Sequence, residues 1–266
     1  MTTQIPEQNR SPSRQTIAST EKNDALWFIR SSDFFSQIGL DNQKQLLDLG
    51  EKRFFKKGET IFRAGSPGEH VYILLDGRVK IYQLSSIGRE VILWFCFPGE
   101  LFGLAEILRS ERRKVFSQSC CDCEILVIGQ SAFTRFLQEC PLAATSVIDL
   151  LSCRLRELGN VHLNVASDDV TSRVVKLMTR LAARYGKRIQ GDIYLDIPIT
   201  HQEMADMIGS SRQTVTEVLG HLRRQGVLRV ENRTIFIQNI AWLENATDAE
   251  NTDITPAPIH LSNYTQ

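Results

Sequence analysis

The side chains best suited to specific hydrogen bonding lie at the start of a segment between residues 211 and 224. Arg212 carries a guanidinium fork that matches guanine O6 and N7, and Gln213 carries an amide that pairs with adenine N6 and N7. Both open an expected helix whose apolar residues recur at helical spacing, namely Val215, Val218, Leu219 and Leu222. That spacing leaves the opposite side polar, so the sequence predicts a helix that presents hydrogen-bonding groups to solvent.

The residues before and after this helix predict how it is held. Thr200 and Glu203 have the spacing of a capping box, and Gly209 permits the positive-φ turn that ends a first helix. Ser211 supplies the cap of the second helix. Residues 227–230 and 234–237 then predict a β-hairpin turned by residues 231–233. The pattern indicates a winged helix-turn-helix, which places a helix in DNA; an ordinary pair of packed helices is the alternative.

We expect this motif to contact DNA with two kinds of side chain. Arg212 and Gln213 are candidates for base edges, and the threonines for phosphates, whereas the carboxylate of Glu217 accepts from cytosine N4 and cannot read guanine. The candidate set is Thr200, Ser211, Arg212, Gln213, Thr214, Thr216, Glu217 and Arg223. Residues 170–240 hold eleven Lys and Arg against six Asp and Glu, although the whole chain has zero formal charge. The excess of basic residues therefore lies where phosphate contact requires it.

The segment between residues 51 and 128 has short apolar runs separated by glycines, which is typical of an antiparallel barrel or sandwich. The clearest expected strands are 60–62, 71–74, 79–82, 91–95 and 124–128. A long helix follows from about Pro141. Its apolar stripe has coiled-coil spacing and comprises Ile148, Leu151, Leu155, Leu158, His162 and Val165. This stripe predicts a two-fold dimer that sets two recognition helices about 34 Å apart on a palindromic site. The alternative is that it packs on its own barrel.

These elements divide the chain of 266 residues into parts. We expect a disordered tail at 1–24, a sensing domain at 25–140, a dimerisation helix and hinge at 141–167, a DNA-binding domain at 168–244 and a second tail at 245–266. The chain has no apolar run long enough for a membrane span and no signal-peptide pattern, so a cytoplasmic protein is expected.

The chain resembles the CRP/FNR family of bacterial transcription regulators over about residues 28–240. The motifs that carry the resemblance are Gly58-Glu59-x-Ile61…Gly65, Tyr72-Ile73-Leu74-x-x-Gly77-x-Val79-Lys80, Phe97-Pro98-Gly99-Glu100-x-Phe102-Gly103, Asp169-Val170-x-x-Arg173 and Ile199-Thr200-x-Gln202-Glu203…Ser211-Arg212-Gln213-Thr214-Val215. The resemblance implies an α+β chain with a β-roll like a cyclic-nucleotide-binding domain, a long dimerisation helix and a C-terminal winged helix-turn-helix. It also implies a homodimer that binds double-stranded DNA, works with RNA polymerase and is no enzyme. A hinge near residues 167–168 then re-aims the recognition helices when an effector binds.

Departures from the family pattern bear on the effector. A cyclic AMP site in this family has Glu after the glycine that corresponds to Gly103, and Ser or Thr after the arginine that corresponds to Arg113. This chain has Leu104 and Lys114 at those positions. Leu158 and Gly159 also replace the hydroxyl residues that reach adenine. A ribose hydroxyl buried without its partner costs about 1–3 kcal/mol, which disfavours cyclic AMP. Arginine forks and free backbone amides instead favour a small anion. The candidate set is Gly103, Leu104, Arg113, Lys114 and Arg154, with structural salt bridges as the alternative role of the arginines.

The cysteines offer a second route for sensing. Six cysteines in a cytoplasmic protein are expected to be reduced, and the candidates for an iron–sulfur cluster or redox site are Cys120, Cys121, Cys123, Cys140 and Cys153. Alternation along a strand puts Cys121 and Cys123 on one face and Cys120 on the other, which argues against a compact ligand shell. We interpret Cys123 as a buried small residue, and His162 as a packing residue rather than a metal ligand.

Two alternative hypotheses involve no specific DNA target. The protein is either a redox-sensing or nucleotide-binding signalling module, or a thiol redox enzyme with Cys120 and Cys121 as its reactive residues. The enzyme reading lacks a base, because no His lies near these cysteines in the sequence.

Overall fold

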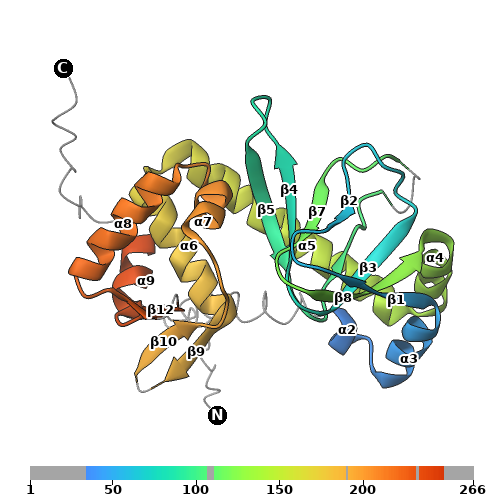
Figure 1. Ribbon diagram of the computed structural model, residues 1–266. Coiled ribbons are helices and arrows are strands. Elements are labelled where there is room, and N and C mark those ends of the chain that lie inside the picture. Colours follow the sequence, from blue (N-terminus) through green and yellow to red (C-terminus); the bar gives the residue numbers. More distant parts are fainter. Residues whose placement is uncertain (1–33, 107–110, 190, 232–233, 249–266) are drawn as a thin grey trace, which may run out of the picture.

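The computed structural model describes residues 34–106, 111–189, 191–231 and 234–248, and Figure 1 shows their arrangement. The tail predicted at residues 1–24 lies outside this part of the chain. Of the tail predicted at 245–266, residues 249–266 also lie outside it, whereas residues 245–248 form the end of helix α9 (Ile240–Asp248). The predicted tail and this helix therefore overlap by four residues.

The first half of the chain is a roll of two four-stranded antiparallel sheets. One sheet has the order β1 (Gly50–Phe55), β8 (Cys123–Gly129), β3 (His70–Asp76) and β6 (Leu101–Phe102). The other has the order β2 (Thr60–Phe62), β7 (Phe116–Ser119), β4 (Val79–Leu84) and β5 (Glu90–Cys96). A shared core fills the space between them, including Phe62, Leu74, Ile81, Phe102 and Ile125. The predicted antiparallel fold and all five predicted strands are confirmed.

The prediction missed β1, β6 and β7. Strand β1 is exposed along most of its length, and β6 has only two residues, so neither produces an alternating apolar pattern. Strand β7 turns Ser117 and Ser119 inward, and small polar residues give no hydrophobic signal although they are buried. These strands form because their neighbours complete the backbone hydrogen bonds.

Three helices lie beside the roll, and a fourth leaves it. Helices α2 (Phe34–Gln37), α3 (Leu40–Asp48) and α4 (Gln130–Glu139) gather at one end of the sheets in Figure 1. Helix α5 (Pro141–Ser167) begins at Pro141, as expected, because proline fits the first turn of a helix. Its inner side packs on the roll through Ala143, Val147 and Leu150. The long helix is therefore anchored at its start and leads away from the β-roll.

The second half of the chain is a winged helix domain. Helix α6 (Val170–Tyr185) starts directly after α5, and the carboxylate of Asp169 caps it by accepting from the Ser172 amide at 2.7 Å. The predicted hinge, residues 167–168, is the break between these two helices. Helices α7 (His201–Ile208) and α8 (Arg212–Arg224) follow, with a sheet of β9 (Gly186–Ile189), β10 (Asp192–Leu195), β11 (Leu228–Glu231) and β12 (Thr234–Ile237). The predicted hairpin is confirmed as β11 and β12; β9 and β10 extend it to four strands.

Candidate nucleic-acid interface and effector pocket

Helices α7 and α8 are fixed by the caps that the sequence predicts. The Thr200 hydroxyl accepts from the Glu203 amide at 3.1 Å, while a Glu203 carboxylate oxygen accepts from the Thr200 amide at 2.8 Å. Gly209 ends α7 with φ of 65°, a left-handed conformation that glycine adopts without strain. The Ser211 hydroxyl then accepts from the Thr214 amide at 3.0 Å and starts α8. The turn between the helices is thus set by local hydrogen bonds.

Packing determines which side of α8 faces solvent. Val215, Val218, Leu219 and Leu222 are buried in the core of the winged helix domain. The opposite side is exposed and carries Arg212, Gln213, Thr216, Glu217 and Arg223. This division agrees with the predicted one, and α8 presents a guanidinium, an amide and a carboxylate on one surface. Such a helix can make the paired hydrogen bonds that base edges require.

Several of these polar groups already have partners. The Gln213 amide donates to the Glu217 carboxylate at 3.0 Å, which ties together two positions one turn apart. The Thr216 hydroxyl donates to the Arg212 carbonyl at 2.8 Å and lies 2.9 Å from His201 Nδ1. Thr216 therefore has no free donor for a phosphate as the helix stands. Burial, followed by the charge of Arg212, lowers the pKa of His201, so this imidazole is neutral at physiological pH.

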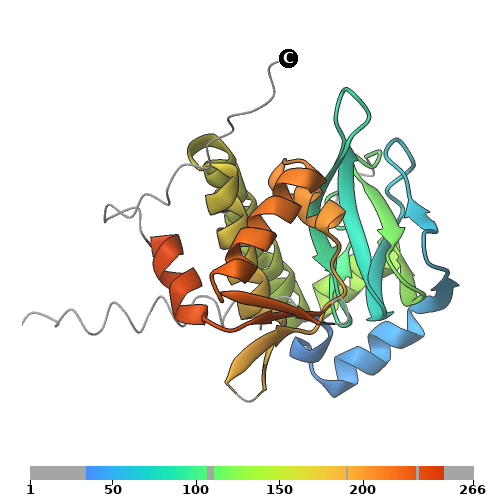
Figure 2. The same cartoon turned by 60° about the vertical axis from the view of Figure 1, so that its left-hand side comes forward.

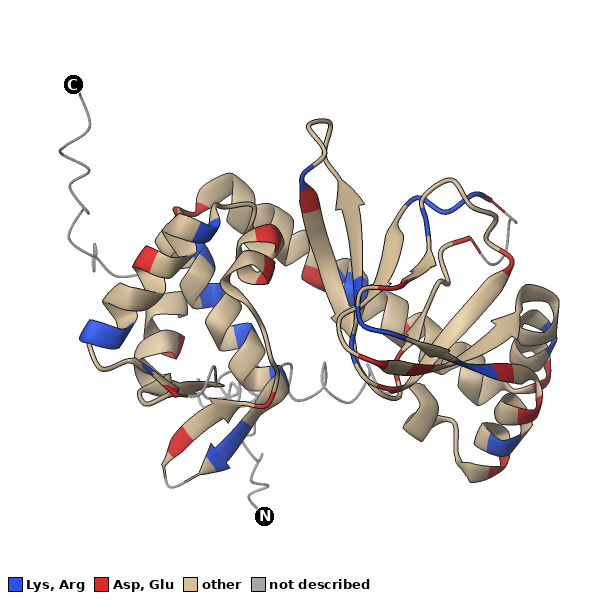
Figure 3. Ribbon diagram, in the orientation of Figure 1, with Lys and Arg blue, Asp and Glu red and all other residues tan. Residues whose placement is uncertain are grey.

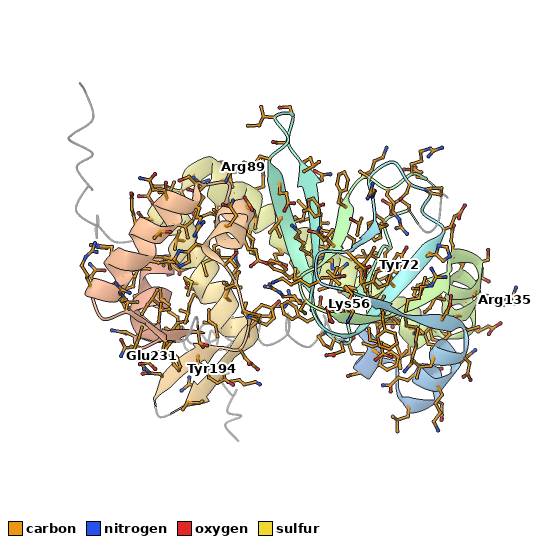
Figure 4. All side chains as sticks on the ribbon, viewed as in Figure 1. Lys56, Tyr72, Arg89, Arg135, Tyr194 and Glu231 are labelled. Carbon is orange, nitrogen blue, oxygen red and sulfur yellow. The ribbon has the colours of Figure 1, made fainter. Side chains whose placement is uncertain are left out.

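The winged helix domain also docks on its own β-roll, which the sequence did not predict. Arg78, directly before β4, donates to Glu203 of α7 at 2.9 Å, and Arg89 lies 3.8 Å from Asp206. One core cluster runs across the boundary, joining Phe95 of the roll to apolar residues of α7. In Figures 1 and 2, α7 faces β5. Figure 4 labels Arg89 on the β4–β5 hairpin beside α7.

A second ion pair crosses the same boundary. Arg184 of α6 pairs with Glu100 of the roll, and both side chains are nearly buried. Tyr185 packs against Phe97 with ring centroids 4.3 Å apart. Burial raises the pKa of Glu100, while the charge of Arg184 opposes that shift. Figure 3 shows Lys and Arg on both domains. Three of these basic residues, Arg78, Arg89 and Arg184, make the ion pairs between the roll and the winged helix domain.

The predicted dimerisation stripe is exposed on α5. Ile148 is 64% exposed and Leu155 73% exposed; Leu151, Leu158 and Val165 are exposed too. His162 is also exposed. The alternative that this stripe packs on its own barrel is wrong, because a neighbouring side of α5 makes that contact through Ala143, Val147 and Leu150. An exposed apolar stripe of this length is typical of an interface.

Arg113 is buried inside the roll and donates hydrogen bonds from both terminal nitrogens. Its Nη1 atom donates to Glu106 at 2.7 Å and to the Gly103 carbonyl at 2.9 Å, and its Nη2 atom donates to the His70 carbonyl. The guanidinium lies over the Phe62 ring at 4.5 Å. Sequence reasoning identified the arginine and missed Glu106, although a single Glu in the apolar run at residues 104–108 is a signal of a buried partner.

Arg154 lies in a different environment from Arg113. Its Nη2 atom donates to the Leu101 carbonyl at 2.7 Å, and its guanidinium is 5.0 Å from the Trp94 ring. It lines a small cavity with Glu100 and Arg184. Within the described residues the two arginines share no acceptor, so the expected convergence of Arg113 and Arg154 on one anion is absent from this conformation. Lys114 is exposed, while Leu104 is buried and Gly103 has a φ of 76°.

The cysteines do not assemble into a ligand set. Across the described parts of the chain, no three His, Cys, Asp or Glu side chains lie close enough together to hold a metal ion. Cys121 and Cys123 pack in the roll core, Cys120 packs at the domain boundary, and Cys140 and Cys153 are buried elsewhere. The structure therefore gives no support to the predicted cluster site, because strand alternation separates the adjacent thiols and Cys140 and Cys153 lie in other parts of the core. The reading of Cys123 as a buried small residue is confirmed.

The described helices include none that is long and apolar enough to cross a membrane. The fold is thus a β-roll joined by the long helix α5 to a winged helix-turn-helix, and α8 of that motif has an exposed polar side.

Two family models match these two halves. The model of the cyclic nucleotide-binding domain matches residues 52–140, and that of the Crp-like helix-turn-helix domain matches residues 172–246. The chain belongs to the CRP/FNR family of transcription regulators.

Its relatives carry different names within that family. The chain is 29% identical to the cyclic AMP receptor protein of Thermus thermophilus over 217 residues, which is 81% of this chain and 97% of the relative. It is 28% identical to the CRP-like cAMP-activated global transcriptional regulator of Mycobacterium tuberculosis, over 70% of this chain and 83% of that protein. It is equally similar, at 28%, to the global nitrogen regulator of Synechococcus elongatus, over 70% of this chain and 84% of that protein.

Solved structures agree with the fold. FixK2 from Bradyrhizobium japonicum matches with a TM-score of 0.66 at 23% identity, covering 74% of this chain and 96% of that one. A CooA mutant from Carboxydothermus hydrogenoformans matches with a TM-score of 0.68 at 21% identity, covering 76% of this chain and 90% of that one.

Proposed function

We propose that the protein is a homodimeric, sequence-specific DNA-binding regulator that occupies a palindromic promoter site in the cytoplasm and contacts RNA polymerase there. The observation that carries this proposal is the exposed face of α8, where Arg212, Gln213 and Glu217 stand together on a doubly capped helix-turn-helix. The relatives are transcription regulators, which supports a role without catalysis.

The proposed parts are a sensing domain at residues 25–140, a dimerisation helix at 141–167 and a DNA-binding domain at 168–244. The exposed stripe of α5 supports pairing of two copies along this helix. A two-fold axis there would set two α8 helices about one turn of DNA apart, which is the spacing of a palindromic half-site pair. The break at residues 167–168 would allow the DNA-binding domain to change its angle.

The signal we propose is a small anion bound in the roll at Gly103, Leu104, Arg113 and Lys114, with Arg154 contributing after a change of conformation. Leu104 still disfavours cyclic AMP, because a leucine side chain cannot hydrogen-bond a ribose hydroxyl. Whichever state binds the anion more tightly is favoured when the anion is present, and this is how the sensor would control α8.

The test is DNA binding by the full chain. Selection from random duplexes should yield a two-fold symmetric site, and Arg212→Ala should lose about 1–3 kcal/mol of binding on that site while weak, salt-sensitive binding persists. Equal loss on selected and scrambled duplexes would make Arg212 a phosphate contact only. Failure to select any site, with the thiols reduced or oxidised, would favour a signalling module without a DNA target.

A further inference from the structure

The predicted anion pocket already contains a carboxylate from the chain itself. Glu106 places one oxygen 2.7 Å from Arg113 Nη1 and the other 3.4 Å from the Lys114 amide, and Arg113 also binds the Gly103 carbonyl. Three of the five residues expected to hold an anion therefore lie around Glu106 and its Arg113 partner. Both members of the ion pair are nearly inaccessible, with Arg113 1% and Glu106 5% exposed.

We propose that Glu106 is a tethered competitor for the effector. The effector is a small organic carboxylate that binds Arg113, and it acts by displacing the Glu106 side chain from that position. The inference rests on the proposed function and names the ligand class of the same site. Glu106 bridges a guanidinium and a backbone amide with its two oxygens, as a free carboxylate would. An incoming carboxylate can therefore reproduce both contacts.

Charge makes the two carboxylates mutually exclusive. A buried guanidinium neutralises one negative charge, and a second carboxylate a few ångströms from the first would be buried without a counter-charge. A second carboxylate also has no space beside the Arg113 guanidinium, because the ring centres of Phe62 and Tyr72 lie 4.5 and 5.8 Å from it. A side chain at Gly68 would also collide with Glu106. The effector can enter only when the Glu106 side chain leaves.

The tether sets the affinity that an effector must have. A group linked to its site by a few bonds acts at about millimolar effective concentration or above, so a free carboxylate competes only at comparable concentration or with extra contacts. Removing the Glu106 charge removes the competitor and leaves the guanidinium available. The affinity of Arg113 for a free carboxylate should then rise.

Calorimetry with succinate on the full chain tests this directly. Glu106→Gln should bind succinate at least tenfold more tightly than the unaltered protein, and the added change Arg113→Gln should abolish the gain. Glu111→Gln is the matched control, because Glu111 is an exposed carboxylate in the same region. Succinate affinity of Glu106→Gln within twofold of the Glu111→Gln value overturns the proposal.

Two further measurements keep the result decisive. If Glu106→Gln does not fold, Glu106→Asp retains the charge with a shorter reach and should still gain threefold or more; no gain overturns the proposal. A larger gain for inorganic phosphate than for succinate overturns the carboxylate class. Duplex binding by the same samples is read separately, so loss of specific DNA binding counts against the proposed regulator and leaves the succinate result standing.

Discussion

The carboxylate of Glu203 binds Arg78 with one oxygen and caps helix α7 with the other. Oε1 accepts from the Arg78 guanidinium at 2.9 Å, while Oε2 accepts from the Thr200 amide at 2.8 Å. The side chains of Arg78 and Glu203 are only 9% and 17% exposed, so water weakens the pair little. One residue thus links the fold of the helix-turn-helix to its docking on the β-roll.

Glu203→Gln should separate these two contributions. Glutamine retains an oxygen for the Thr200 amide, since it serves in capping boxes, but it loses the charge that Arg78 binds. A hydrogen bond to a charged group contributes about 1.5–3 kcal/mol, and that amount should be lost from domain docking. We expect cleavage by a protease at the break between α5 and α6 to become several-fold faster.

Thr200→Ala is the matched control for this change. It removes the hydroxyl of the cap, at about 1 kcal/mol, and leaves Arg78 paired with Glu203. Cleavage at residues 167–168 should stay close to the rate of the unaltered protein. If both variants are cleaved at the same rate, the ion pair does not hold the domains together.

Local features were predictable from the sequence and contacts between distant residues were not. The caps at Thr200 and Ser211 involve residues three positions apart, so their spacing is visible in the chain. The partner of Arg78 lies 125 positions away, and no local pattern connects the two. Glu106 is close to Arg113 in sequence, but which groups the roll buries together depends on how β3, β6 and the following loop pack. Exposed charges were predicted well, and buried charge pairs were not.

The Gln213–Glu217 hydrogen bond predicts how base preference depends on Glu217. Glu217→Gln preserves an acceptor for the Gln213 amide and removes the charge that repels phosphate. Its binding to scrambled duplex should strengthen, while the base preference at the Gln213 position remains. Glu217→Ala also frees the amide, so it should additionally lose about 1–3 kcal/mol of discrimination at that base pair.

Fluorescence anisotropy on the selected duplex and on single-base variants measures both effects at two salt concentrations. Loss of base preference in Glu217→Gln would mean that the Glu217 charge itself reads a base. Unchanged preference in both variants would exclude any role for this pair in recognition.

The exposed stripe of α5 predicts the oligomeric state. Leu155→Asp places a charge where two helices would bury apolar surface, and we expect the dimer to dissociate at least a hundredfold more readily, because burying an unpaired charge costs several kcal/mol. Asn160→Asp adds the same charge to the same exposed helix outside the stripe and should leave the dimer intact. Sedimentation equilibrium measures both constants. Equal dissociation constants for the two variants would place the interface elsewhere.

Burial predicts which thiols react. The pKa of Cys96 rises to about 12 and that of Cys120 to about 11, in both cases mainly through burial, so the thiolate that alkylating agents attack is scarce near pH 7.5. The half-buried Cys121 should be labelled first by iodoacetamide, Cys120 more slowly, and Cys96 only after unfolding. Peptide mass spectrometry resolves the sites, and Cys121→Ser is the control for the first label.

The same shift fixes the sign of a pH effect on stability. A thiol with a raised pKa in the folded protein keeps its proton where the unfolded chain has already released it, so the free energy of unfolding falls as pH rises from about 9 toward 12. Cys96→Ala should unfold with a smaller loss of stability over this range, measured by urea denaturation at successive pH values. A curve parallel to that of the unaltered protein would show that Cys96 ionises in the folded state as easily as in water, and would remove the thiol at residue 96 from the buried core.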